Sequence, residues 1–265
     1  MSTIKTLLSE KNDESKGLLS GSVLKTIAVV SMVIDHVGSH LIRNWFVLSG
    51  HNVITETFGI NNLIHFVIDI CDALGSIAFP LFCFLTAEGF YYSKSREKYA
   101  IRLFIFALIS EIPFNLVHRM RILYPDLQNV MFTLAISILT LLIASRTDGK
   151  YGETKMEMPA RIAVIILGMG AAFAVKGEYV FLGVLAIALF YYLRDYKYLR
   201  LIAFVPLAVP SLWSLLAIPA VIMYNGTRGK QSKYFFYVFY PAHFLIIYAI
   251  MALWLKITPE FFAVY

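Results

Sequence analysis

The sequence predicts an all-α, polytopic membrane protein, a helical bundle with about nine transmembrane helices. Three observations carry this prediction. Apolar residues make up 59% of the 265 positions and charged residues 15%, whereas soluble domains have about 45–50% and 25%. The mean hydropathy is +0.70. Long apolar runs alternate with short basic segments, which is typical of chains that cross a bilayer repeatedly. A single water-soluble domain is excluded, and the net charge of +6 indicates membrane topology and not nucleic-acid binding.

The first elements follow from length and polarity. Residues 1–22 are polar and carry charges of both signs, which predicts a short cytoplasmic segment and no signal peptide. Residues 23–265 form one transmembrane domain. A crossing needs about 20 residues, and four apolar runs reach that length: 23–47, 73–92, 99–118 and 235–255. The run 129–144 is slightly short but still predicts a helix, and 61–72 suits an interfacial or re-entrant helix.

Two further stretches are each predicted to contain a turn between two short helices. Residues 161–193 are too long for one span and have Lys176-Gly177-Glu178 at their middle. Because charges at mid-bilayer are costly, we expect a turn there between two short helices. Residues 199–224 contain three prolines and have basic clusters at both ends. Two short helices that turn near Ser211 would keep both clusters on one side. One crossing here is the alternative, and it gives eight spans instead of nine.

The distribution of Lys and Arg predicts the orientation. With nine spans, 18 of these residues fall on one side and 5 on the other. The side with the excess is the cytoplasm, so we expect the N-terminus inside, the C-terminus outside, and a multi-pass location in the cytoplasmic membrane. The lipid bilayer is then the first partner of the protein. The two cysteines, Cys71 and Cys83, are too few for a disulfide framework.

Ionisable groups inside spans are costly, so each is a functional candidate. Asp35 and His36 lie near the midpoint of the first span. Three polar stripes at helical spacing run outward from mid-membrane: His36, Ser39, His40 and Arg43 on the first span; Glu111, Asn115, His118 and Arg119 on the third; Asn129, Thr133 and Ser137 on the fourth. Their common depth predicts a water-filled cleft that opens outward. The alternative is that these groups hold the helices together by hydrogen bonds.

The inner half has a polar set of its own. Glu88 lies in the second span, Arg102 begins the third, and Tyr240 and His243 share a face of the last. Glu88 and Arg102 could simply form an ion pair, and His243 could be a packing residue. The sequence has no Cys/His cluster, HExxH motif, phosphate loop or Gly-x-Ser-x-Gly elbow. We therefore expect no metal.

Five ordered blocks resemble the TraX family. They are Leu24-Lys25-Thr26-Ile27-Ala28 with Met32-Val33-Ile34-Asp35-His36-Val37-Gly38; Ala78-Phe79-Pro80-Leu81-Phe82-Cys83-Phe84-Leu85 with Glu88-Gly89-Phe90; Arg102-Leu103 with Phe106-Ala107-Leu108-Ile109-Ser110-Glu111-Ile112-Pro113-Phe114; Asn129-Val130-Met131-Phe132-Thr133-Leu134; and Phe239-Tyr240-Pro241-Ala242-His243. These membrane proteins are linked to N-terminal acetylation of conjugative pilin, and they look like relatives of larger membrane acyltransferases. The family usually has Gly-Arg where this chain has Gly75-Ser76.

The resemblance implies an integral membrane acyltransferase. It would move an acetyl group from cytoplasmic acetyl-CoA, its acyl donor, to an amine or hydroxyl on the outer side. The acceptor stays open between a pilin N-terminus, another peptide and a surface glycan. His36 would act as general base or carry the acetyl group transiently, with Asp35 or Glu111 orienting it. Residues expected to bind acetyl-CoA are Lys25, Arg102, Lys230, Lys233, Tyr240 and His243. Residues expected to bind the acceptor are His40, Arg43, Glu88, Asn115, Asn129 and Thr133.

Two other classes compete with the enzyme. A proton-coupled membrane transporter could use the same intramembrane Asp, His and Glu residues as a proton relay, and paired short helices also occur in carriers. Against it, we find no internal repeat that relates the two halves of the chain. A non-catalytic scaffold would not need buried charge at this density.

Overall fold

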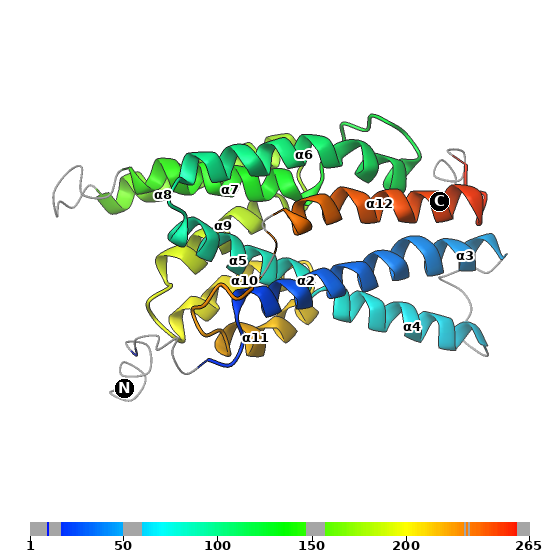
Figure 1. Cartoon of the computed structure of the whole chain (residues 1–265), viewed down its shortest axis with the longest axis horizontal. Coiled ribbons are helices and arrows are strands. Elements are labelled where there is room, and N and C mark those ends of the chain that lie inside the picture. Colours follow the sequence, from blue (N-terminus) through cyan, green and yellow to red (C-terminus); the bar gives the residue numbers. More distant parts are fainter. Residues whose placement is uncertain are drawn as a thin grey trace.

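The computed structural model describes residue 10 and residues 17–49, 60–146, 157–230, 232 and 234–258. Within these ranges every regular element is helical, and the extended pairing is limited to two isolated bridges, Leu19 with Tyr224 and Gln128 with Gly177. The predicted all-α class is confirmed for the part of the chain that is described (Figure 1).

The described residues form the following helices, in chain order. They are α2 (Gly21–His36), the π-helical η2 (Val37–Ile42), α3 (Arg43–Leu48), α4 (Ile60–Gly75), α5 (Ala78–Tyr92), α6 (Arg96–Arg119), α7 (Val130–Ser145), α8 (Glu157–Val175), α9 (Val180–Tyr192), η3 (Leu199–Ala203), α10 (Phe204–Ala208), η4 (Leu212–Ala217), α11 (Ile218–Ile222) and α12 (Phe235–Leu253).

Five helical stretches are long and apolar enough to cross a membrane. They are Gly21–Leu48, Leu63–Tyr92, Arg96–Arg119, Met158–Val175 and Phe235–Leu253. Four shorter apolar helices accompany them in the described ranges: Val130–Ser145, Val180–Tyr192, Leu199–Ala208 and Leu212–Ile222. The chain is therefore a multi-pass membrane protein, while the count of nine crossings and the cytoplasmic N-terminus remain predictions.

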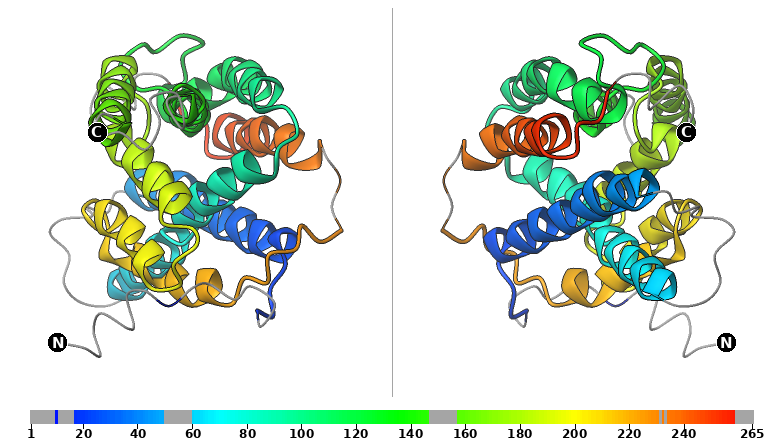
Figure 2. Two further views of the ribbon diagram at one scale, coloured as in Figure 1. Left: turned by 90° about the vertical axis from the view of Figure 1, so that its left-hand side faces the viewer. Right: turned by 90° about the vertical axis from the view of Figure 1, so that its right-hand side faces the viewer.

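The bundle has three layers. Helices α6, α7 and α8 form one side, α4, α10 and α11 form the other, and α2, α5 and α12 lie between them (Figures 1 and 2). Helix α6 packs on α7 and α12, whereas α2 packs on α4 and α5. The first turns of α2 and α6 lie toward one end of the bundle, near the end of α9. We call this end, which carries Lys25, Arg102, Arg194 and Arg228, the basic end.

Two glycines let α4 approach α2 closely. A Cβ at Gly38 would lie 2.5 Å from the Cβ of Cys71, and one at Gly75 would lie 2.3 Å from the Cβ of Asp35. Only hydrogen fits at either position. Helix α4 therefore runs along α2 and η2 and continues into α5 after a break at Ser76. The segment expected at 61–72 is thus the first part of the second long apolar stretch, and not a separate interfacial helix.

The predicted turn near Ser211 is present. Helices η3 and α10 lead into the turn, and η4 and α11 lead out of it, with Ser211 at the N-cap of η4. The ends of this hairpin are joined by Arg200, whose Nη2 donates to the Val221 carbonyl at 3.0 Å. Each limb combines a 3-10 and an α-helical segment. At about 2.0 and 1.5 Å per residue, a limb is roughly 18–20 Å long and therefore shorter than the hydrocarbon core of ~30 Å.

Candidate functional site

A cavity opens at the basic end. Its volume is about 530 Å³, which is within the range of small-molecule sites. Three cationic side chains from different parts of the chain line it: Lys25 of α2, Arg102 of α6 and Arg228 of the segment before α12. This basin is therefore suited to a ligand with several negative charges.

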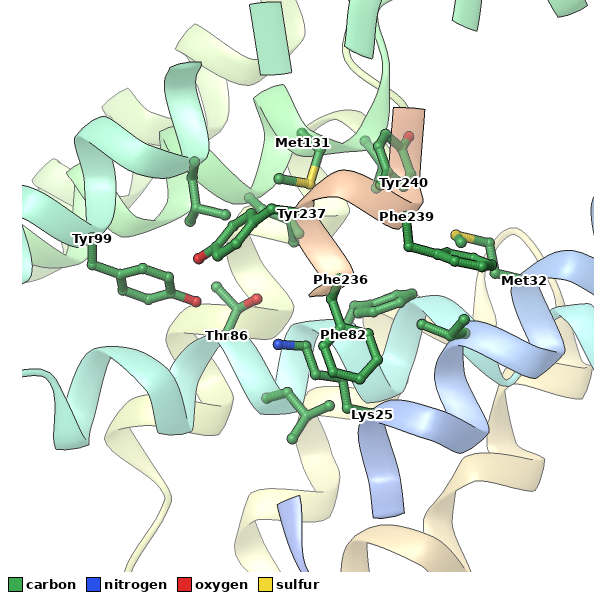
Figure 3. A pocket seen from close by; sticks show the side chains of 15 residues that line it. Lys25, Met32, Phe82, Thr86, Tyr99, Met131, Phe236, Tyr237, Phe239 and Tyr240 are labelled. Atoms are coloured by element: carbon green, nitrogen blue, oxygen red, sulfur yellow. The ribbon is translucent and has the colours of Figure 1, made fainter. Parts of the chain in front are cut away.

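A narrower apolar channel adjoins the basin. It has a volume of about 90 Å³ and shares Lys25, Leu85, Tyr99 and Tyr237 with the basin. Figure 3 shows Lys25 and Tyr99 away from Met32, Phe239 and Tyr240, which line the opposite part of the channel. The lining is mostly aromatic and aliphatic, so the channel suits a thin, largely uncharged chain.

Four histidines meet just beyond the channel. His36 Nδ1 lies 2.9 Å from His243 Nε2, and the ring centroids are 5.8 Å apart for His36–His40 and 4.6 Å apart for His40–His118. These side chains come from α2, η2, α6 and α12, so distant segments build the cluster. Met32 and Phe239, which line the channel, each precede a cluster histidine by one helical turn.

A π-helical segment lies within the cluster. Helix η2 (Val37–Ile42) lies between α2 and α3 and carries His40. Such segments inside α-helices occur frequently at functional sites. His36 and His40 of the first predicted stripe thus meet His118 of the second. His243, which was predicted to bind acetyl-CoA, joins them.

A carboxylate lies beside the histidines. Asp35 Oδ2 lies 3.9 Å from His36 Nε2, and the Asp35 side chain packs on Gly75.

The backbone of Glu178, in the turn between α8 and α9, donates to the Gln128 carbonyl at 3.0 Å. After it, Tyr179 and Val180 have φ values of +58° and +42°, which are strained for a bulky and a β-branched residue. Strain of this kind often marks functional sites.

Glu178 was missed at the level of sequence, where it counted only as one charge of a turn. Its carboxylate is close enough to Asp35 and Tyr240 to interact with them electrostatically. Tyr240 lines the channel, so Glu178 belongs to the same site as Asp35. The available signal was an acidic residue at a predicted turn within the long apolar run 161–193.

We expect Glu178 to make stability depend on pH. Burial, and then the neighbouring Asp35, raise the pKa of Glu178 from 4.5 to about 7. The folded protein therefore holds this proton more tightly than the unfolded chain, and stability is lost as pH rises from about 4.5 through 7. Glu178→Gln stays neutral, so its melting temperature relative to wild type should rise between pH 5 and pH 8. An equal difference at both pH values would contradict this.

Several predicted acceptor-binding residues instead make structural bonds. Asn129 is fully buried; its Nδ2 donates to Glu111 Oε2 at 2.6 Å, and its Oδ1 caps α7 by accepting from the Met131 amide. Thr133 donates to the Glu178 carbonyl at 2.5 Å, and Asn115 donates to the Ile122 carbonyl at 3.3 Å. The geometry of this set favours the alternative in which the stripes of α6 and α7 hold the bundle together. Acceptor binding by these residues remains a prediction.

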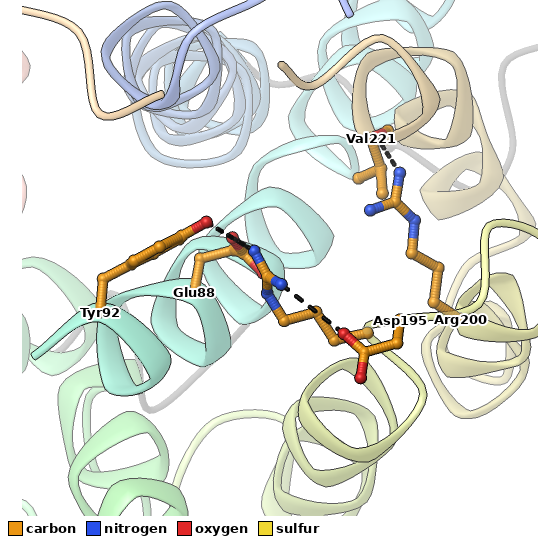
Figure 4. A network of polar contacts seen from close by, with 6 residues as sticks. Glu88, Tyr92, Asp195, Arg200 and Val221 are labelled. Carbon is orange, nitrogen blue, oxygen red and sulfur yellow. Dashed lines mark hydrogen bonds and ion pairs between the residues drawn. The ribbon is translucent and has the colours of Figure 1, made fainter. Parts of the chain in front are cut away.

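The charged candidates are also partnered. Arg43 Nη2 donates to Asp72 Oδ2 at 2.9 Å. Glu88 accepts from Arg194, whose Nε lies 2.7 Å from Oε1 and whose Nη2 lies 3.2 Å from Oε2 (Figure 4). The ion partner that the structure gives to Glu88 is therefore Arg194, and not the Arg102 considered from the sequence.

Apart from His243, which lies in the histidine cluster, the predicted acetyl-CoA residues divide into three groups. Lys25, Arg102 and Tyr240 line the basin or the channel, as expected for such a site. Lys230 is exposed and is not among the lining residues of the basin, where Arg228 takes its place. Lys233 lies outside the described residues. A cluster of nearby basic residues could be recognised from the sequence, but not which of them turns inward.

Helices long enough to cross a membrane and a buried histidine–carboxylate cluster beside a cavity define a multi-pass membrane protein with an intramembrane polar site. The TraX protein family model matches residues 20–251. The chain belongs to the TraX family. It is also similar to a probable fimbrial assembly protein FimC (serogroup H1) of Dichelobacter nodosus, with 27% identity over 253 aligned positions that cover 84% of this chain and 92% of that protein. No solved structure matches the chain significantly.

Proposed function

We propose that the chain is an acetyl-CoA-dependent acyltransferase of the cytoplasmic membrane. It takes the acetyl group at the basic end, on the cytoplasmic side, and transfers it to an amine or hydroxyl acceptor that approaches from the opposite side. The name of the similar FimC protein makes a pilin-like peptide one candidate acceptor, beside a surface glycan.

One observation carries the proposal: the basin, the channel and the histidine cluster follow one another. Acetyl-CoA has a polyanionic nucleotide end, a thin pantetheine arm and a terminal thioester. Lys25, Arg102 and Arg228 offer positive charge at the wide basin, the channel offers an apolar lining, and His36 and His243 lie one helical turn beyond Met32 and Phe239. The order of the three regions is the order of the three parts of the donor.

In the proposed reaction, His36 acts as general base. It removes a proton from the acceptor amine or hydroxyl as this group attacks the thioester carbonyl carbon. The carbon–sulfur bond breaks, and the leaving thiolate receives a proton, so coenzyme A departs as the thiol. Asp35, at 3.9 Å from His36, stabilises the imidazolium that forms between these steps.

Purified protein incubated with acetyl-labelled acetyl-CoA tests the proposal. We expect release of coenzyme A and labelling of an added acceptor peptide at its N-terminal amine. A transporter would bind no CoA species and would instead move protons down an imposed pH gradient in proteoliposomes. That second result would favour the alternative class, because the buried Asp, His and Glu groups would suit a relay.

We expect Arg102 and Arg228 to act mainly on donor affinity. Contacts from cations to phosphates are charge-assisted and are screened by salt at partly hydrated sites. Changing each residue to Gln should raise the KM for acetyl-CoA by about tenfold at low salt, with kcat little changed. Lys176→Gln, which loses only an exposed ion pair with Asp126, is the matched control. An unchanged KM in both variants would remove the two arginines from the site.

A further inference from the structure

We infer that His243 is a positioning residue that fixes the tautomer of His36, so that the Nε2 atom of His36 is the one with a free lone pair. The catalytic meaning of this inference rests on the proposed function, but its geometry does not. Two hydrogen bonds in series determine which nitrogen carries the proton.

The first bond involves His243 and the backbone of its own helix. His243 Nδ1 lies 3.2 Å from the carbonyl oxygen of Phe239. A carbonyl oxygen can only accept, so His243 Nδ1 must carry the hydrogen. In a neutral imidazole the other nitrogen is then an acceptor, and His243 Nε2 is bare.

The second bond transmits this choice to His36. His36 Nδ1 lies 2.9 Å from His243 Nε2. Since His243 Nε2 can only accept, His36 Nδ1 must donate, and His36 Nε2 is left without hydrogen. Only an unprotonated nitrogen can remove a proton, so the chain of bonds holds His36 in the form that the proposed reaction needs.

Packing keeps both rings in this arrangement. The His36 and His243 rings are almost parallel, at 8° with centroids 5.1 Å apart, and Phe244 stacks on His36 at 4.8 Å. Phe239 stacks on His243 at 7°. His243 is only 5% exposed, so water has little access to compete for its Nε2.

Nitrogen-15 NMR of histidine-labelled protein in detergent tests the assignment directly. The chain has six histidines, and the His36→Gln spectrum identifies the signals of His36. We expect the wild type to show hydrogen on His36 Nδ1 and a bare Nε2. In His243→Leu, which cannot accept, we expect hydrogen to shift toward Nε2. His243→Gln places an amide oxygen near the position of Nε2, so it should keep the wild-type tautomer.

Kinetics then separates positioning from packing. We expect His243→Leu to lower kcat by about 10- to 100-fold, with the KM for acetyl-CoA within about twofold, and His243→Gln to restore most of the turnover. Hydrogen on His36 Nε2 in the wild type would overturn the inference, whether or not His243→Leu folds. The expected tautomer in a protein without acetyl transfer would uphold the hydrogen-bond assignment and overturn the catalytic role, which separates the two claims.

Discussion

His36→Gln lowers the turnover of acetyl transfer by about 10²–10⁴-fold, the usual contribution of a general base. The amide of Gln can donate and accept hydrogen bonds, but it cannot take a proton at neutral pH. Because His36 lies beyond the channel and not in the basin, binding of acetyl-CoA should change little. The test measures kcat and the Kd for coenzyme A in the purified wild type and in the purified variant, and compares each quantity between the two proteins.

His65→Gln is the matched control for this change. His65 lies on α4 and contacts Phe46, with ring centroids 5.2 Å apart, and this contact involves none of the partners given above for His36. Its turnover should stay within about twofold of wild type. Near-normal turnover of His36→Gln would make His36 a structural hydrogen bonder, and the base would then have to be sought among Asp35, Glu111 and Glu178.

Glu88→Ala costs about 3–5 kcal/mol of folding free energy, the usual result of breaking a buried ion pair. The side chains of Glu88 and Arg194 are only 5% and 11% exposed. After removal of the carboxylate, the contacts that Arg194 keeps include Tyr92 Oη at 2.7 Å, the Tyr91 ring at 4.0 Å, and the exposed Asp195 carboxylate at 3.8 Å. None of these replaces the two bonds that the Glu88 carboxylate accepts.

Unfolding in increasing denaturing detergent measures this cost. Asp126→Asn is the control, because it breaks an ion pair at the surface: the side chains of Lys176 and Asp126 are 55% and 59% exposed. Exposed pairs contribute about 0–1 kcal/mol. A double change of Glu88 and Arg194 to Leu should recover part of the loss, since the buried cation is then removed together with its carboxylate. A loss below about 1 kcal/mol for Glu88→Ala would show that the pair stabilises the bundle no more than a surface pair.

The sequence predicted the helical class and several turns correctly because these depend on local features. Charges at Lys176-Gly177-Glu178 and prolines around Ser211 interrupt apolar runs, and an interrupted apolar run must turn. The break at Ser76 was harder, because apolar sequence continues on both sides of it. The close contact between Gly75 and Asp35, which joins α4 to α2, leaves no periodic signal.

The site could be predicted only one helix at a time. Helical spacing grouped His36 with His40, but it could not show that His243, 207 positions away, would bond to His36. The same limit hid the Arg194 partner of Glu88, at a separation of 106 positions. Pairing between distant helices depends on three-dimensional packing, which a single sequence does not report.

In the proposed function, acetyl-CoA reacts from the basic end of the bundle. The test uses proteoliposomes that contain the protein in one known orientation, with acetyl-labelled acetyl-CoA supplied on one side and an acceptor peptide on both. We expect coenzyme A release and acetyl transfer only when acetyl-CoA is on the side of Lys25, Arg102 and Arg228, and we expect both to be lost in His36→Gln. Equal turnover from the opposite side, or turnover that persists without His36, would contradict the account.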